Sequence, residues 1–208
     1  MKTLTLAAIR CSLMFTAVTA SLFSTWTAQA NYIVRLQQVG PNVVATGSGA
    51  FDLTGLTVHP RGFSTTLIKP FLGNIVTGIS ARCDVYGTTI TGPNSFGTGT
   101  ETLADNGTGG LVGILFNGGH EPFLLVPVGY VSGTALSDSS TYNSATFASL
   151  GVTPGTYVWT WGTGLPNQNF TLQIGLGVPP PVPDGGSTVS LLGCALLGLA
   201  ALRSKLSC

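Results

Sequence analysis

The stretch GTYVWTWGTGLPNQNFTLQIG, residues 155–175, contains two runs in which apolar and polar side chains alternate. The first run places Tyr157, Trp159 and Trp161 on one side, and the second run, residues 169–174, does the same with phenylalanine, leucine and isoleucine. Alternation with a period of two is typical of β-strands that bury one face. Gly, Asn and Pro separate the two runs and indicate a loop. The stretch therefore predicts a β-hairpin with one apolar face.

Similar short runs occur through most of the chain and are separated by Gly, Asn and Pro. We expect the other strands at residues 32–38, 42–52, 74–79, 82–86, 111–116, 122–131 and 144–148. Short helical turns are the alternative near residues 60–70 and 138–149. This many short strands indicates an all-β domain over residues 31–177, an antiparallel β-sandwich of which the jelly roll is one form.

The composition limits the function classes. The 208 residues include 8 Lys and Arg and 7 Asp and Glu, which is 7% of the chain, whereas about 25% is usual in soluble domains. A formal net charge of +1 excludes the basic surface that binding to nucleic acid requires. An apolar share of 44% excludes disorder of the highly charged type. The abundant threonine suits strands and wets a β-surface with hydroxyl groups instead of charges.

The first 30 residues have the pattern of a signal peptide. Two basic residues lie within the first ten positions, and an apolar run follows them. Ala28 and Ala30 then supply the small residues that a signal peptidase accepts before Asn31. The apolar run is shorter than the roughly 20 residues of a permanent membrane helix. We therefore expect cleavage after Ala30, with an uncleaved membrane anchor as the alternative.

A second apolar segment lies near the other end of the sequence. Residues 189–202, VSLLGCALLGLAAL, are followed by Arg203 and Lys205. We expect residues 189–208 to form a single transmembrane helix with a basic tail, which leaves the body outside the cytoplasm. A buried terminal helix of the domain is the alternative, but this segment has no polar face to present to water.

A proline-rich linker and a short motif, residues 178–188, precede this helix. Residues 178–183, VPPPVP, predict an extended polyproline spacer. The motif then consists of Val182, Pro183, Asp184, Gly185 and Gly186. Two glycines leave its backbone unhindered for an enzyme that cuts the chain.

The motif, the apolar helix and the basic residues, in this order, resemble the sorting tail of PEP-CTERM surface proteins, in the variant that reads Val-Pro-Asp-Ser/Gly-Gly. The resemblance implies recognition by an exosortase, a membrane transpeptidase or protease with its own catalytic cysteine, in bacteria that make extracellular polysaccharide. This chain would be the substrate of that enzyme. The protein would be held briefly in the inner membrane and then reach the cell surface or the extracellular matrix.

Single residues give little indication of a catalytic, cofactor or metal site, and we assign none. His59 and His120 lack the i+4 partner of common zinc motifs. Asp105 and its neighbours resemble part of a calcium loop, but a turn is the simpler interpretation. Gly47-Ser48-Gly49 is not the Gly-x-Ser-x-Gly motif of serine hydrolases. Cys83 is interpreted as a small buried strand residue, because no second cysteine lies within residues 31–177.

Three functions follow from these observations. The first is a non-enzymatic, exported surface or matrix protein associated with exopolysaccharide or biofilm, with a signal peptidase and an exosortase-like enzyme as partners. The second is a carbohydrate-binding module that stacks sugars on Tyr157, Trp159 and Trp161, although such a row is commonly the core face of a strand. The third is a glycan-acting enzyme, which needs two carboxylates in one cleft. Its candidates are Asp52, Asp84, Glu101, Asp105, Glu121 and Asp138.

Overall fold

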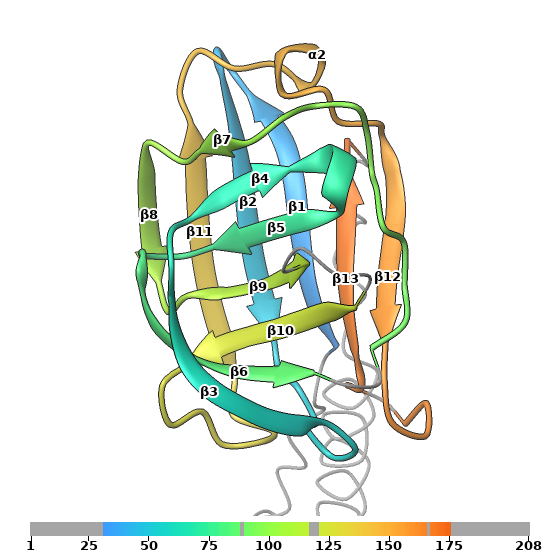
Figure 1. Ribbon diagram of the computed structural model, residues 1–208. Helices are drawn as coiled ribbons and strands as arrows, with labels where there is room; N and C mark the ends of the chain where they lie inside the picture. Colours follow the sequence, from blue (N-terminus) through green and yellow to red (C-terminus); the bar gives the residue numbers. More distant parts are fainter. Residues whose placement is uncertain (1–30, 88–89, 117–120, 166, 176–208) are drawn as a thin grey trace, which may run out of the picture. The chain divides into compact units, whose positions relative to one another are not determined.

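The computed structural model describes residues 31–87, 90–116, 121–165 and 167–175 (Figure 1). The predicted signal peptide (1–30), the linker with the sorting motif (178–188) and the predicted membrane helix with its tail (189–208) lie outside these residues. Among the residues that are described, no helix is long and apolar enough to cross a membrane.

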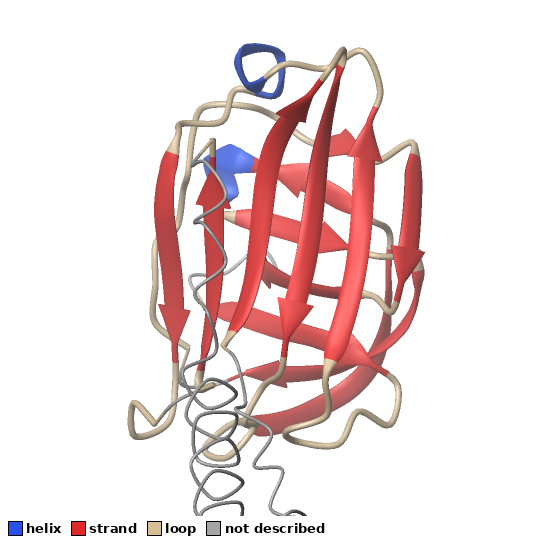
Figure 2. Cartoon of the chain, turned by 180° about the vertical axis from the view of Figure 1, so that it is seen from behind, coloured by secondary structure: helices blue, strands red, loops and turns tan. Residues whose placement is uncertain are grey.

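The described chain is built almost entirely of strands, which confirms the predicted all-β class (Figure 2). The strands are β1 (Tyr32–Val39), β2 (Asn42–Gly49), β3 (Thr57–Ser64), β4 (Leu67–Lys69), β5 (Asn74–Thr77), β6 (Ala81–Gly87), β7 (Thr102–Leu103), β8 (Asn106–Gly109), β9 (Val112–Phe116), β10 (Pro122–Pro127), β11 (Leu136–Tyr142), β12 (Gly155–Thr160) and β13 (Asn169–Ile174). Two short helical turns are η2 (Pro70–Leu72) and α2 (Phe147–Leu150).

The strands form two sheets that pack face to face. One has the order β12-β13-β1-β2-β11-β8, and the other has the order β3-β6-β10-β9-β5-β4-β7. In Figure 1 the strands β4, β5, β9 and β10 of the second sheet run across the direction of β1, β2 and β11 in the first. This is the arrangement of a sandwich with crossed sheets.

The predicted hairpin is confirmed. β12 and β13 pair antiparallel, with Trp159 opposite Phe170 and Tyr157 opposite Leu172. Opposite residues of an antiparallel pair point to the same face of the sheet. The large apolar side chains of both strands therefore enter the core together, where Trp159, Phe170 and Leu172 are fully buried.

One strand pair is parallel, so the six-stranded sheet is mixed and not purely antiparallel as predicted. β1 runs parallel to β13, with Tyr32 opposite Phe170 and Leu36 opposite Ile174. β1 is also antiparallel to β2. The first and last strands of the domain thus lie side by side inside the same sheet.

The strand predicted at residues 144–148 is wrong. β11 ends at Tyr142, and α2 follows with a reciprocal cap in which Thr146 and Ser149 exchange side-chain and backbone hydrogen bonds. Such a cap satisfies N–H groups that would otherwise lack partners at the start of a helix. Gly151 then ends the turn with a left-handed φ of 62°.

The helical turns considered for residues 60–70 are also largely replaced by strand. β3 extends to Ser64, and β4 follows at Leu67–Lys69. β3 is an edge strand whose pairing with β6 is interrupted by a bulge between His59 and Gly62. Pro60 lies in this bulge. The pairing between the strands is interrupted there, so the lack of an N–H group on proline costs no hydrogen bond to β6.

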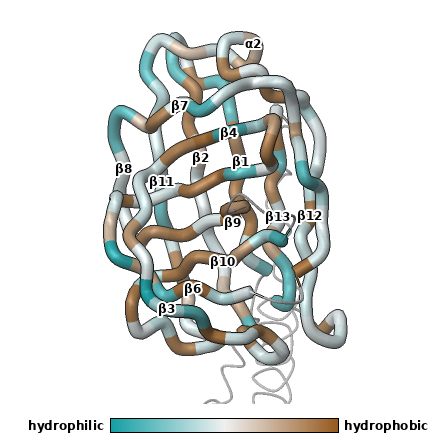
Figure 3. The backbone as a smooth tube through the Cα atoms, in the orientation of Figure 1, coloured by the Kyte–Doolittle hydropathy of each residue, from teal (hydrophilic) through white to brown (hydrophobic). Residues whose placement is uncertain are grey.

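The core lies between the two sheets and contains a cluster of aromatic rings. Phe51 contacts Tyr32, Trp161 and Phe170, with ring centroids 4.5, 5.9 and 6.3 Å apart. Figure 3 shows further hydrophobic runs along β4, β9 and β10 of the seven-stranded sheet. Several of these residues lie on the other face of that sheet, away from the main core, which positions the groove described below.

Candidate functional site

The aromatic row considered for sugar stacking lies in the core. Trp159 is 0% exposed and Trp161 is 3% exposed. Their indole N–H groups donate to Pro93 O at 3.0 Å and to Asp52 O at 2.8 Å. Tyr157 is half-buried and donates to Thr153 O at 3.0 Å. The two tryptophans therefore occupy the core face of the strand, the other interpretation given for this row, and their indole rings offer no face to a sugar.

Five acidic residues of the body, Asp52, Asp84, Glu101, Asp105 and Asp138, have separate partners. Asp84 accepts hydrogen bonds from the Gly129 N–H at 2.7 Å and from Arg61 at 2.6 Å. The Gly129 bond makes the largest contribution to lowering the pKa of Asp84, and Arg61 adds to it. Lys69 pairs with Glu101 at 3.4 Å. Asp52 is hydrogen-bonded to Thr54 and Gln168, Asp105 to Asn143, and Asp138 to Tyr32.

The structure gives no support to a metal site in the part of the chain that it describes. No group of three His, Cys, Asp or Glu side chains lies close enough together there to hold an ion. His59 lies on β3 with its ring edge-on to Phe123, at a centroid distance of 5.0 Å. His120 lies outside the described residues.

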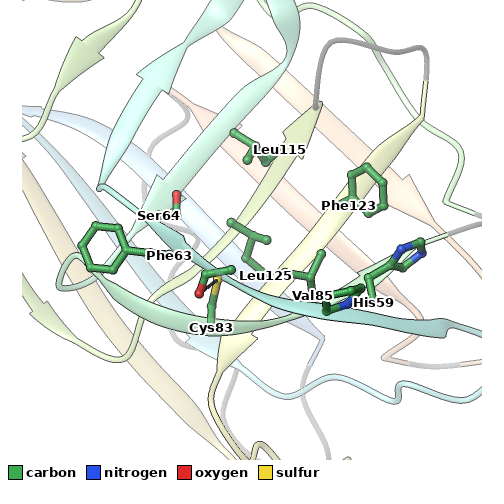
Figure 4. Close-up of a pocket in the computed structure, with 10 residues that line it drawn as sticks. His59, Phe63, Ser64, Cys83, Val85, Leu115, Phe123 and Leu125 are labelled. Atoms are coloured by element: carbon green, nitrogen blue, oxygen red, sulfur yellow. Dashed lines mark hydrogen bonds between the residues drawn. The ribbon is translucent and has the colours of Figure 1, made fainter.

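A groove of about 420 Å³ lies on the outer face of the seven-stranded sheet (Figure 4). Leu124 and Val126 of β10 point into the main core, whereas Leu125, between them, belongs to a second apolar cluster with Cys83. Because successive strand residues point to opposite faces, Leu125 and Cys83 face away from the main core. They lie on the floor of this groove.

The walls of the groove are apolar and aromatic. Phe63 lies toward one end, and Phe123 and His59 lie toward the other (Figure 4). Phe63 is 67% exposed, so one wall presents an aromatic ring to solvent. The Nε2 atom of His59 is buried and has no hydrogen-bond partner among the described residues. The groove can hold an apolar group, and none of the residues that line it is Asp, Glu, Lys or Arg.

Cys83 is 1% exposed on the groove floor, which confirms its interpretation as a buried strand residue. Its thiol lies 3.8 Å from Gly62 O, and burial raises its pKa. A thiol in this state is a poor nucleophile, because the thiolate is the reactive form. Cys83 therefore packs at the floor of the groove with its thiol in the less reactive, protonated form.

The groove was not predicted from the sequence, because its rim lies on β3. Residues 57–64 contain His, Pro, Arg and Gly and do not alternate as a strand with one buried face would. The signal that could have found it lies in the central strands. β10, PFLLVP, is apolar at consecutive positions, which indicates burial on both faces of a sheet.

Comparison with known proteins gives one match. A family model described as the VPDSG-CTERM motif matches residues 181–206. The match contains the sequence Val-Pro-Asp-Gly-Gly at residues 182–186, the apolar segment and both basic residues that follow it. It confirms the predicted resemblance to a PEP-CTERM-like sorting signal. No curated protein and no solved structure matches the chain.

Such a signal implies export to the surface or the extracellular space and processing by an exosortase-type membrane enzyme. The match covers the tail alone, so it does not assign an activity to the β-sandwich.

Proposed function

We propose that this chain is an exported, non-enzymatic surface or matrix protein. Its sandwich is the cargo, and its tail anchors it in the membrane until an exosortase-like enzyme cuts near residues 182–186. The observation that carries this proposal is the match of residues 181–206 to the VPDSG-CTERM motif. In this scheme the motif residues Val182, Pro183, Asp184, Gly185 and Gly186 are the recognition and cleavage region.

The C-terminal boundary of the fold supports this proposal. β13 ends at Ile174, and the N–H of Gly175 donates to Leu36 O at 3.0 Å. The motif begins further along the chain, at Val182. Every described strand therefore precedes the motif, so cleavage there removes no strand from the sandwich.

The N-terminal boundary is consistent with removal of a signal peptide after Ala30. β1 begins at Tyr32, which is 0% exposed and pairs with strands on both sides. A cleavage site much further along the chain would remove part of a central strand. We therefore propose that signal peptidase cuts between Ala30 and Asn31, which leaves β1 whole.

A structural role for the sandwich is supported by the distribution of its polar groups. The carboxylates of Asp84, Asp105 and Asp52 are hydrogen-bonded to different parts of the fold, and the groove is lined largely by apolar residues. The outer face of the six-stranded sheet carries exposed hydroxyls at Thr46, Thr156 and Thr160. Such a surface binds water without strong ionic attraction, which suits residence in a hydrated polysaccharide matrix.

Intact mass spectrometry of the exported protein tests the processing step. We expect the exported form to lack residues 1–30 and the tail beyond the motif. An Asp184→Ala variant should retain the tail and remain in the membrane fraction. Val178→Ala is the matched control, because it changes the linker outside the matched residues and should be processed normally. Export of the unaltered chain with residues 189–208 still attached would refute the proposal.

A further inference from the structure

β11 carries polar side chains on its core-facing side. Asp138, Ser140 and Tyr142 alternate along the strand, and they are 6%, 0% and 1% exposed. The Ser140 hydroxyl accepts a hydrogen bond at 3.0 Å from the N–H of Gly78, the residue after β5 of the opposite sheet. We call these three residues the polar column of β11.

Asp138 is bound by a tyrosine that reaches over an intervening strand. The hydroxyl of Tyr32, on β1, donates to one carboxylate oxygen of Asp138, on β11. β2 lies between these two strands, and its residue opposite Asp138 is Gly47. A Cβ atom at position 47 would lie 2.7 Å from Asp138 Oδ1 and would overlap the Tyr32 hydroxyl. The missing side chain of Gly47 therefore creates the space in which Tyr32 and Asp138 meet.

The second carboxylate oxygen, Asp138 Oδ1, is buried and has no hydrogen-bond partner in the part of the chain that the structure describes. A buried carboxylate with an unpaired oxygen is costly, because water no longer solvates its charge. The same carboxyl group carries no charge when it is protonated. The residues around Asp138 therefore determine whether the folded chain carries it as the carboxylate or as the neutral carboxylic acid.

The groups around Asp138 do not supply a positive charge. Tyr32 comes from β1, and Tyr130 lies near the Tyr32 hydroxyl from the loop after β10; both are neutral at ordinary pH. The neighbouring hydroxyl from β5 is that of Thr77, while β2 and β8 present Gly47 and Gly109.

The basic side chains of the described body are directed elsewhere. Arg61 and Lys69 are paired with Asp84 and Glu101. Arg35 alternates with the core residues Val34 and Leu36 and so faces away from the core, and Arg82 lies in the other sheet.

We propose that the folded domain carries Asp138 as the neutral carboxylic acid, and that loss of its proton to water loosens β11 and the edge strand β8. The proton is the only species transferred, and the product is a buried carboxylate. Burial raises the pKa of Asp138, while the hydrogen bond from Tyr32 and the nearby hydroxyl of Thr77 oppose this effect. β8 pairs with β11 alone in its sheet, so loosening of β11 also frees β8. The sandwich thus contains a pH-sensitive element that is more rigid in acidic than in alkaline surroundings.

The sign of this effect follows from proton linkage. The unfolded chain loses the Asp138 proton near its ordinary pKa of about 4, whereas the folded chain holds it to higher pH. The contribution of Asp138 to the free energy of unfolding has its full value below the pKa of the unfolded chain. It is lost as the pH rises through the pKa of the folded chain. Within this window the unfolding equilibrium constant should rise about tenfold per pH unit, because one proton is released on unfolding.

Urea unfolding of the full exported chain between pH 4.5 and 8 tests the proposal, with fluorescence of the buried Trp159 and Trp161 as the signal. Asp138→Asn keeps the shape of the side chain and cannot ionise, so its unfolding equilibrium constant should not rise with pH in this range. Glu121→Gln removes an exposed carboxylate, and its unfolding equilibrium constant should rise with pH as in the unaltered chain. A flat profile for the unaltered chain, or an equal rise in Asp138→Asn, would overturn the proposal.

Carbon-13 NMR of the aspartate carboxyl groups covers the case in which Asp138→Asn does not fold. In the folded, unaltered chain one aspartate carboxyl should remain protonated well above pH 5. If every aspartate is ionised by pH 5, the proposal is wrong.

Discussion

Tyr32 and Phe170 lie opposite each other in the parallel pair of β1 and β13, with their ring centroids 5.6 Å apart. They come from the first and last strands of the described domain, and both are 0% exposed. The Phe170 ring also contacts Phe51 and Trp159. Phe170 therefore joins the two ends of the domain to the centre of the core.

Replacing Phe170 by alanine should destabilise the domain by about 3–5 kcal/mol, because it deletes a fully buried ring and leaves a cavity. The measurement is urea unfolding followed by tryptophan fluorescence. Val158→Ala is the control on the neighbouring strand, since Val158 is 40% exposed and its loss should cost about 1 kcal/mol or less. Equal midpoints for the two variants would contradict the central position of Phe170.

The hairpin β12–β13 could be predicted from the sequence because its alternation is strong and its partners are close along the chain. The pairing of β1 with β13 could not, since nothing local in either strand indicates a partner at the other end of the domain. β11, LSDSSTY, has a single aliphatic residue, Leu136, and its core-facing positions are polar. Such a strand does not show the apolar alternation on which the prediction depended.

The sorting motif could be predicted because a linear signal is read along the chain and needs no fold. The groove depends on β3, in which Pro60 and the bulge after His59 interrupt the alternation of apolar and polar residues that predicts a strand. The position of Asp138 depends equally on its distant neighbours, since Tyr32 reaches it only over Gly47. The tail and the strongly alternating strands could therefore be predicted from the sequence, whereas the groove and the site of Asp138 depend on tertiary contacts.

Gly47→Ala should destabilise the domain by about 1–3 kcal/mol, the usual cost of placing an extra carbon in a filled core. The new Cβ would lie 2.7 Å from Asp138 Oδ1. Removing the competing hydroxyl with Tyr32→Phe should recover part of this loss, so the double variant should be more stable than the sum of the two single effects predicts. Unfolding midpoints of the four proteins provide the measurement. Ser48→Ala, at the exposed next position, is the control, and strict additivity would show that the hydroxyl is not the obstacle.

Asp84 should make the domain sensitive to strong acid. The Gly129 N–H and Arg61 lower the pKa of Asp84 in the fold, so its stabilising effect is complete above the unfolded value of about 4. It is lost as the pH falls through the folded pKa. Urea unfolding between pH 5 and 2 should show this loss, and Asp84→Asn should reduce its slope. Asp52 contributes in the same direction, because the Thr54 hydroxyl and N–H lower its pKa. An unchanged slope in Asp84→Asn would contradict the assignment to Asp84.

Cys83 should resist alkylation in the native protein. The thiol lies on the groove floor, Cys83 is 1% exposed, and burial raises its pKa. Both effects lower the amount of accessible thiolate, which is the species that reacts with iodoacetamide. Peptide mass spectrometry after treatment at pH 8 should find Cys83 unmodified in the folded chain and modified in urea. Rapid labelling without denaturant would mean that the groove opens down to its floor, in which case its apolar lining is more accessible than the packing of Leu125 and Cys83 indicates.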